Sequence, residues 1–286
     1  MPSIPDSRAR RRVAAMTALA GALAACSAAP RATPPAASST APPADAAAAT
    51  PATSRRLAPD VVVTLVAPGL WMHVTEDPTS RYPSNGMLLE TDSGTVLVDT
   101  AWDDRQTRVL LEWAAHELGR PVRRAVVTHA HEDRVGGLGA LHEAGIPVRS
   151  LGATARLVAA AGGTPPDSIA ALSARPVADA AGFELFHPGP GHAPDNLVVW
   201  FPAQRVLFGG CLVKADTATT VGNVADADVD AWPGTVARVR ARYAAAAIVV
   251  PGHGAVSTPA ALTATEALIR AKGPAAREAL RRRRGA

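Results

Sequence analysis

The segment Thr128-His129-Ala130-His131-Glu132-Asp133-Arg134 places three potential metal ligands within five positions. It follows Arg124-Ala125-Val126-Val127, a short β-branched run typical of a buried strand. On an extended segment, alternation points His129 and His131 the same way, and Asp133 continues the series. Two neutral imidazoles and a carboxylate facing one small volume suit zinc, and Asp133 is also free to serve a second ion. The alternative, three ordinary core or surface residues, is disfavoured because unligated polar groups are costly to bury together.

Three further candidate ligands each stand in a glycine-rich turn. His192 follows Gly189-Pro190-Gly191, Cys211 follows Gly209-Gly210, and His253 lies between Gly252 and Gly254. Taken singly, each has an ordinary explanation as a turn histidine, a small buried hydrophobe or a loop residue. Together with the first cluster they predict six metal ligands at strand-to-loop junctions. The remaining histidines are interpreted as structural or surface residues, namely His73, His116, His142 and His187.

From about Val61 to the final helix, the chain resembles the metallo-β-lactamases, specifically subclass B1, whose second zinc site holds a cysteine. The motifs that carry the resemblance occur in the family's order: Pro83-Ser84-Asn85-Gly86, Val98-Asp99-Thr100, THAHEDRVGG, GHAPDNLVVW, GGCLVKA and GNVADAD. The wider superfamily of zinc hydrolases, which includes glyoxalase II, tends to have a histidine where this chain has Arg134. Those proteins also use a bridging aspartate in place of Cys211, and the softer thiolate favours zinc over manganese or iron.

The resemblance implies two Zn2+ ions per chain, one held by three histidines and one by an aspartate, a cysteine and a histidine. The matching residues are His129, His131 and His192 for the first ion, and Asp133, Cys211 and His253 for the second. Other lactamase subclasses change the first histidine or the cysteine, and neither is changed here.

Four further site residues follow from the resemblance. Lys214, three after Cys211, matches the residue that grips the substrate carboxylate, and Asn196 matches the one beside the reacting carbonyl. Asp99 resembles a carboxylate that lies behind the metal ligands and orients them. Arg134 is expected to support the ligands in the same way. Lysines are usually solvated surface charges and asparagines in glycine-rich turns are usually turn formers. Only their spacing from the ligands favours a function for Lys214 and Asn196.

The function implied by the resemblance is zinc-dependent hydrolysis of the β-lactam amide bond in penicillins, cephalosporins and carbapenems, which confers antibiotic resistance. The expected nucleophile is a hydroxide formed on the first zinc, oriented by Asp133, with the developing oxyanion stabilised by that zinc and by Asn196. Lys214 would hold the substrate as a point charge. Two alternatives stay open: a zinc hydrolase of the same superfamily acting on a thioester, lactone or phosphodiester, and a surface zinc-binding protein without catalysis.

The N-terminus predicts export. Residues 1–25 combine a basic start with a short apolar stretch, and Leu23-Ala24-Ala25-Cys26 reads as a lipobox at which Cys26 would be acylated. Ser27 favours the outer membrane, so the expected location is the periplasm by a lipid anchor; ordinary cleavage and a soluble periplasmic protein is the alternative. Residues 26–59, rich in Ala, Pro, Thr and Ser, predict a disordered tether. With Cys26 lipidated and Cys211 metallated, no disulfide is expected.

Residues 60–286 are sufficient for one catalytic domain, and a monomer is expected. The formal net charge of +4 is misleading. Residues 1–25 hold four arginines and Asp6, so the remainder carries +1, and Arg281–Arg284 account for four of its positive charges. The domain has no basic stripe with interleaved aromatic residues, so nucleic acid is not expected as a partner.

Strands followed by helices occur twice along the domain, which predicts an α/β fold with two packed sheets and helices outside. The resemblance makes this the αβ/βα four-layer sandwich, with the metals at one edge. Expected strands are 61–66, 70–75, 87–91, 95–99, 185–186, 197–201, 206–208 and 248–250. Expected helices are 103–118, 137–144, 153–161, 229–245 and one from about 259. The segment Thr75–Pro83 matches the family's mobile flap but is polar, with only Tyr82 to contact an apolar substituent.

Overall fold

The structure, a computed structural model, describes residues 53–285. The expected signal peptide at 1–25, the lipidation site Cys26 and most of the expected tether lie outside the described residues. Among the helices of residues 53–285, none has the length and apolar character required to cross a membrane.

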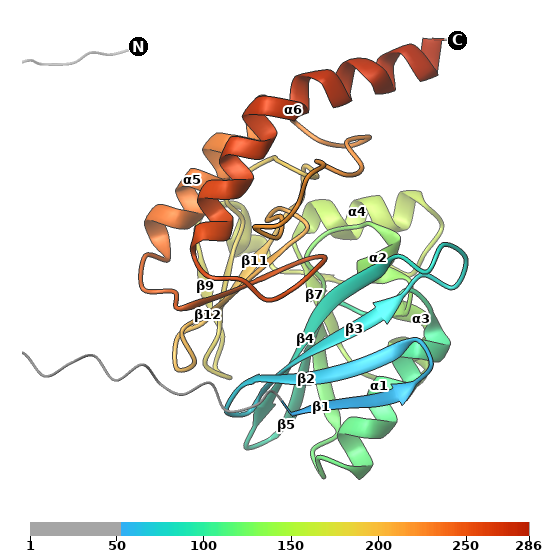
Figure 1. The fold of residues 1–286 in the computed structure, drawn as a ribbon. Helices are drawn as coiled ribbons and strands as arrows, with labels where there is room; N and C mark the ends of the chain where they lie inside the picture. The colour runs from blue at the N-terminus through green and yellow to red at the C-terminus, as the bar shows by residue number, and fades with distance from the viewer. Residues whose placement is uncertain (1–52, 286) are drawn as a thin grey trace, which may run out of the picture. The chain divides into compact units, whose positions relative to one another are not determined.

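The larger sheet has eight strands in chain order (Figure 1). Its first five strands form an antiparallel meander, and the fifth to eighth run parallel, each reached through helical segments. The strands are β1 (Ser54–Ala58), β2 (Val61–Ala67), β3 (Leu70–Glu76), β4 (Pro83–Thr91), β5 (Gly94–Val98), β6 (Val122–Val126), β7 (Val148–Ser150) and β8 (Asp167–Ser168).

The smaller sheet has five strands, in the spatial order β13-β12-β11-β10-β9. Only β12 and β13 run parallel, and the other neighbours are antiparallel. The strands are β9 (Val177–Ala178), β10 (Glu184–Phe186), β11 (Val198–Phe201), β12 (Val206–Gly210) and β13 (Ile248–Pro251).

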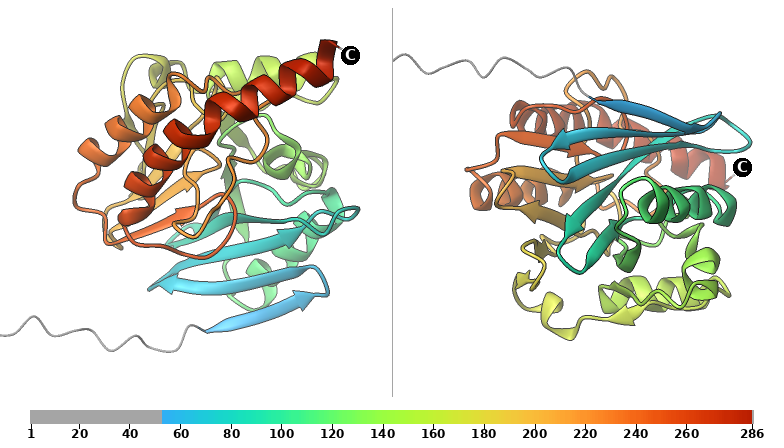
Figure 2. Two further views of the ribbon diagram at one scale, coloured as in Figure 1. Left: turned by 45° about the horizontal axis from the view of Figure 1, so that its top comes forward. Right: turned by 90° about the horizontal axis from the view of Figure 1, so that it is seen from below.

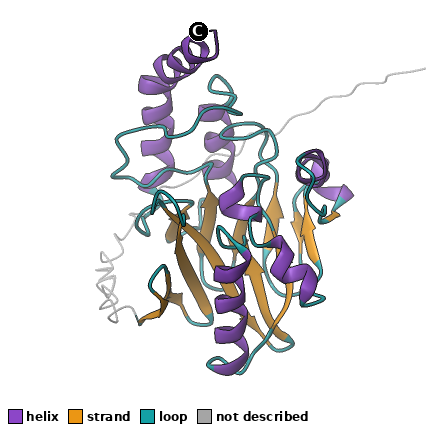
Figure 3. Cartoon of the chain, turned by 90° about the vertical axis from the view of Figure 1, so that its right-hand side faces the viewer, coloured by secondary structure: helices purple, strands orange, loops and turns teal. Residues whose placement is uncertain are grey.

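Helical segments cover the outer faces of both sheets (Figure 3). The larger sheet is covered by α1 (Asp104–His116), α2 (Glu132–Val135), α3 (Leu138–Glu143) and α4 (Gly152–Ala160), and a short 3-10 helix, η1 (Ala170–Ser173), follows β8. The smaller sheet is covered by α5 (Trp232–Arg242) and α6 (Ala260–Gly285), which lie side by side (Figure 2).

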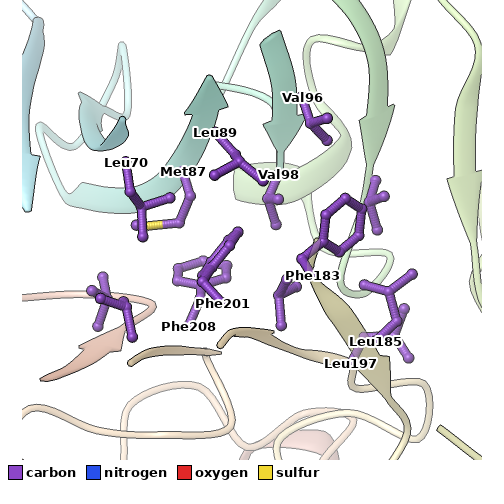
Figure 4. Packing of buried hydrophobic residues seen from close by; sticks show 14 of the residues in the cluster. Leu70, Met87, Leu89, Val96, Val98, Phe183, Leu185, Leu197, Phe201 and Phe208 are labelled. Atoms are coloured by element: carbon purple, nitrogen blue, oxygen red, sulfur yellow. The ribbon is translucent and has the colours of Figure 1, made fainter. Parts of the chain in front are cut away.

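Period-2 alternation divides the core into three layers. Leu70, Met87 and Val98 point between the sheets toward Phe201 and Phe208 of the smaller sheet (Figure 4). Their chain neighbours point the other way: Trp71, Leu88 and Leu97 pack under α1 and α3. Val198, Leu207 and Val249 likewise pack under α5 and α6. The expected four-layer sandwich is therefore confirmed.

Two expectations about local structure were wrong. Residues 54–58, assigned to the tether, form β1, which pairs antiparallel with β2 and packs Leu57 against the core. Backbone hydrogen bonds hold this mostly exposed edge strand, and with Leu57 as its one large apolar residue it has no apolar alternation from which to predict it. Asp133 does not continue an extended segment, because α2 begins directly after His131 and Asp133 lies in its first turn.

Candidate metal centre

Strand ends position most of the predicted ligands. His129 and His131 follow β6, Cys211 follows β12, and His253 follows β13. Because β6 runs parallel to β5 and β13 runs parallel to β12, each pair ends at one edge of its sheet. The last ligand, His192, comes from the loop between β10 and β11.

Backbone hydrogen bonds join the two sheets at this edge. Leu197 N donates to Thr128 O at 2.8 Å, and Asn85 N donates to Gly252 O at 2.9 Å. The buried carboxylate of Asp195 accepts from Ala130 N at 3.0 Å, so it ties the His192 loop to the peptide between the two other histidines. These contacts bring the three ligand loops to one place.

Three histidine nitrogens converge at the first of two adjoining positions. His131 Nδ1 lies 3.1 Å from His129 Nε2 and 3.0 Å from His192 Nε2. His131 Nε2 faces the Asp226 carboxylate at 3.0 Å, which places its proton there and leaves a lone pair on Nδ1. Tetrahedral zinc with bonds of about 2.0–2.1 Å requires ligand nitrogens about 3.3 Å apart. The histidine set therefore fits Zn2+.

The second position joins three different donors. Cys211 Sγ lies 3.2 Å from His253 Nε2 and 3.5 Å from Asp133 Oδ2, and the last two atoms are 3.3 Å apart. His253 Nδ1 donates to Pro83 O at 2.7 Å, so Nε2 is free to act as a ligand. Sulfur, nitrogen and oxygen donors at this spacing also fit zinc.

The charge of the ligands supports cation binding. Burial lowers the pKa of His129 and of His192 well below its usual value, which keeps both imidazoles neutral and able to ligate. Burial works to raise the pKa of Asp133, but the positive charge of Arg134 holds it well below the usual range. Asp133 is therefore a carboxylate.

Arg134 is fully buried behind the second position. Its Nη2 lies 2.8 Å from Asp133 Oδ2 and donates to Cys211 Sγ at 2.9 Å. The same nitrogen donates to Gly252 O at 2.9 Å, next to His253. Burial opposes the charge, but the negative charges of Asp133, Cys211 and Asp99 outweigh burial and raise the pKa of Arg134. The guanidinium thus contacts two ligands and the loop of the third.

Asp99 connects both halves of the centre from behind. It adopts a left-handed backbone conformation, with φ of 63°. Its carboxylate accepts from Thr128 N at 2.7 Å and lies 3.3 Å from Arg134 Nη1. Burial raises the pKa of Asp99 to about 6, against the opposing effect of Arg134. The strained backbone directs this carboxylate toward Thr128, which precedes His129, and toward Arg134, which follows Asp133.

A cavity of about 280 Å³ opens over the ligands. Its walls are Trp102, His131, Glu132, Asp133, His192, Cys211, Asn223 and His253. A larger hollow, of about 690 Å³, is lined by residues 90–93, Arg123, Arg124 and residues 180–182. Each candidate ligand group found in residues 53–285 has at least two members in the wall of the smaller cavity, so the chemistry is placed there.

Lys214 lies close to this cavity. Its Nζ is 5.2 Å from the centre of the Trp232 ring, and the ring of His192 packs against that tryptophan at 5.5 Å. Burial lowers the pKa of Lys214. Within residues 53–285 no carboxylate pairs with Nζ within 4.0 Å, so the ammonium is free to meet an anion.

The structure places Asn196 away from the wall of the cavity. The side chain is 2 % exposed and its amide is used inside its own turn: Nδ2 donates to Ala193 O, and Oδ1 accepts from Ala193 N at 3.1 Å. Asn196 therefore shapes the His192 loop and lies outside the residues that line the cavity. The amide in the cavity wall belongs to Asn223.

Sequence reasoning missed Asn223 and Asp226, although both lie in the GNVADAD motif. Asn223 comes twelve residues after Cys211, beyond a stretch without strands or helices, and Asp226 is an exposed carboxylate in the same loop. Their only local signal was a cluster of Asn, Asp and Gly, which usually indicates a turn.

The comparisons with known proteins agree with this geometry. The model of the metallo-beta-lactamase superfamily matches residues 79–253. A metallo-beta-lactamase type 2 from Bacillus sp. (strain 170) is 40% identical over 188 residues, covering 66% of this chain and 73% of that protein. Another from Bacteroides fragilis is 35% identical over 204 residues, covering 70% of this chain and 82% of that protein.

Solved structures show the same fold. The metallo-beta-lactamase FIM-1 from Pseudomonas aeruginosa, in a mono-zinc form, matches with a TM-score of 0.71 at 36% identity, covering 75% of this chain and 98% of that one. A metallo-beta-lactamase from Erythrobacter litoralis matches with a TM-score of 0.69 at 34% identity, covering 76% and 99%. The chain therefore belongs to the metallo-β-lactamase superfamily and is an enzyme of its B1 subclass.

Proposed function

We propose that this enzyme hydrolyses the amide bond of β-lactam rings with two Zn2+ ions. One observation carries the proposal: six candidate ligand residues from distant parts of the sequence come together, and five of them line one cavity. His129, His131 and His192 would hold one ion; Asp133, Cys211 and His253 would hold the other. When bound, zinc supplies Lewis acidity and lowers the pKa of coordinated water from about 15.7 to about 7.

The surrounding side chains bind and orient the reactants. Asp133, a carboxylate in the cavity wall, accepts a hydrogen bond from the attacking water and orients it. Asn223 donates from its amide to the carbonyl oxygen as negative charge develops there. Lys214 holds the carboxylate of the substrate as a point charge, which places the ring over the ligands. Arg134 and Asp99 keep the ligands in place from behind.

Penicillins, cephalosporins and carbapenems all combine a strained amide with a carboxylate, and we propose all three classes as substrates and resistance as the biological outcome. Purified protein would be assayed with nitrocefin and a carbapenem, with and without EDTA. Turnover that EDTA abolishes and zinc restores supports the proposal. Thioester or lactone turnover without β-lactam turnover would favour the rival hydrolase.

Lys214→Ala separates the enzyme from a zinc-storage protein. Storage requires the ligands but gives the lysine no role. The enzyme predicts unchanged zinc content with KM for β-lactams raised about tenfold, the factor that corresponds to 1.4 kcal/mol of lost binding. A variant with the parent's KM would remove Lys214 from the mechanism.

We also propose that the enzyme works as a monomer in the periplasm, anchored to the outer membrane through acylated Cys26. The support is the lipobox and the composition of residues 26–52, which fits a tether of the domain described here. Cys26→Ser should move the protein from the membrane fraction to the soluble periplasmic fraction. Equal membrane association of parent and variant would refute the anchor.

A further inference from the structure

The loop between β12 and α5, residues 211–231, carries several groups of the site. Cys211, Lys214 and Asn223 belong to it, and Asp226 within it faces His131. It is built from turns without strand or helix. A neighbouring element of the fold must therefore hold these side chains in place relative to the other ligands.

The buried hydroxyl of Thr265, in α6, holds the backbone at Lys214. Lys214 N donates to Thr265 Oγ1 at 2.9 Å, and Lys214 O lies 3.2 Å from the same oxygen. The hydroxyl in turn donates to Ala261 O, one turn back in the helix, at 2.7 Å. Because the hydroxyl has one proton and its shorter contact is to Ala261 O, α6 holds the lysine through the hydrogen bond that Thr265 accepts from Lys214 N.

Contacts farther along α6 hold the rest of the loop. Lys272 Nζ donates to Thr219 O at 2.6 Å, and Arg277 forms an ion pair with Asp230. The three contacts at Thr265, Lys272 and Arg277 follow one another along the helix. They reach the beginning, the middle and the end of the loop.

Gly273 of α6 also contacts the loop, by close packing. A Cβ at this position would come 2.5 Å from Val229 Cγ1, and Val229 is buried among the apolar residues under α6. A β-branched side chain has few rotamers with which to move away. The loop therefore rests directly on the helix backbone at this point.

We propose that α6 is the positioning element of the 211–231 loop, and that Thr265 is the positioning residue that sets the place of Lys214. This role rests on the proposed hydrolysis of β-lactams. None of the six predicted ligands contacts Thr265 through a side-chain hydrogen bond within residues 53–285. We therefore expect Thr265 to act on substrate binding, through Lys214, and not on zinc binding.

The test replaces the hydroxyl without changing the shape of the side chain. Thr265→Val leaves the buried Lys214 N–H without an acceptor, so the loop shifts and KM for nitrocefin rises about tenfold. The value of kcat and the zinc content stay close to the parent's. Thr265→Ser restores the acceptor and should restore KM. Thr263→Val is the matched control, because Thr263 is exposed on the same helix and makes no side-chain hydrogen bond within residues 53–285.

Hydrogen–deuterium exchange gives a readout that does not depend on turnover. In Thr265→Val, the amides next to the lost contact, those of residues 214–218, should exchange faster than in the parent and in Thr263→Val. If the parent hydrolyses no β-lactam, the proposed function fails, but the exchange experiment still judges the positioning role. Unchanged exchange and KM in Thr265→Val would overturn the inference, and so would a loss of zinc together with kcat.

A second variant tests the role of α6 independently of any local effect of the valine in Thr265→Val. Gly273→Ala ordinarily favours a helix, yet here the added methyl must displace Val229. It should speed exchange of residues 223–231 and lower kcat through Asn223, with zinc content unchanged. Behaviour identical to the parent would show that α6 does not set the position of the loop.

Discussion

At the scale of single residues, the centre depends on buried charge that is balanced locally. Arg134 is fully buried, and such a cation is stable only with compensating partners. It has two carboxylates, of Asp133 and Asp99, and the sulfur of Cys211 within 3.3 Å. Removing one of these partners would leave a buried charge without compensation. The ligands and their supports therefore form one unit.

Substitution of Asn223 should affect turnover, whereas substitution of Asn196 should affect stability. Asn223→Ala removes the amide in the cavity wall, and we expect kcat to fall about tenfold, less than the roughly 10²-fold of a sole oxyanion donor. Its thermal stability should match the parent's. Steady-state kinetics and thermal unfolding check both statements.

Asn196→Ala is the contrasting variant. It removes the amide that holds the Gly189–Asn196 turn, so the free energy of unfolding should fall by about 1–3 kcal/mol. Zinc binding at His192 should weaken with it. The assignment of the two asparagines would be reversed if Asn196→Ala lost kcat at unchanged stability.

His73 should make stability depend on pH. It is fully buried, and burial lowers its pKa from 6.5 to about 4. The unfolded chain binds a proton below pH 6.5, whereas the folded protein binds it only near pH 4. Stability is therefore complete above pH 6.5 and decreases as the pH falls toward 4, by about 2 kcal/mol between pH 7 and 5.

The measurement is denaturant unfolding at pH 7 and at pH 5, for the parent and for His73→Gln. Asp99 has its pKa raised to about 6, so it contributes with the opposite sign in the parent and in the variant alike. The difference between the two proteins isolates the histidine. Equal pH dependence in both would contradict the prediction.

At the scale of elements, the flap is shorter than expected. β3 continues to Glu76 and β4 begins at Pro83, which leaves residues 77–82 as the loop. The Asp77 carboxylate accepts from Thr79 N at 2.7 Å and from Ser80 Oγ at 2.7 Å, so the turn is closed on itself. Tyr82 is exposed and stacks on His253 with ring centres 4.9 Å apart.

This flap presents one aromatic ring and otherwise polar groups to a substrate. We expect KM values for β-lactams with bulky apolar side chains to be higher than for small penems, because little apolar surface is available to cover them. Tyr82→Ala should raise KM for the bulky substrates further and leave small ones unchanged. KM values for bulky apolar substrates as low as those for small penems would count against it.

At the scale of the whole molecule, the centre joins the two sheets. The ligands of each proposed ion come from both halves of the sandwich: Asp133 from the larger sheet's side meets Cys211 and His253 from the smaller. A metal that binds only the folded chain stabilises it by mass action, about 2.7 kcal/mol at a hundred times Kd.

Removal of the metal should therefore loosen the fold as well as stop turnover. EDTA is expected to lower Tm by about 5–10 °C, and added zinc should restore it. Cys211→Ser offers a comparison, because it weakens only the site formed by Asp133, Cys211 and His253. The change in Tm caused by EDTA should therefore be smaller in this variant than in the parent. An apo protein as stable as the zinc-loaded one would show that the ions do not tie the sheets together.

The sequence alone predicted six candidate ligands and the family from short local motifs, and the resemblance carried by those motifs implied the four-layer sandwich. Alternation of apolar residues assigns strand faces, and ligands at strand ends lie at predictable edges. His129, His131 and Cys211 stood in motifs short enough to be recognised from a few residues.

Only the tertiary structure showed which asparagine lines the cavity and which residue contacts the backbone of the lysine. Asn196 and Asn223 both stand in polar turns, and no local rule distinguishes an amide used within its turn from one facing a cavity. The contact of Thr265 with Lys214 spans 51 residues, and its partners share no pattern in the chain. Such contacts arise when α6 packs on the smaller sheet, because packing is set by the fold as a whole.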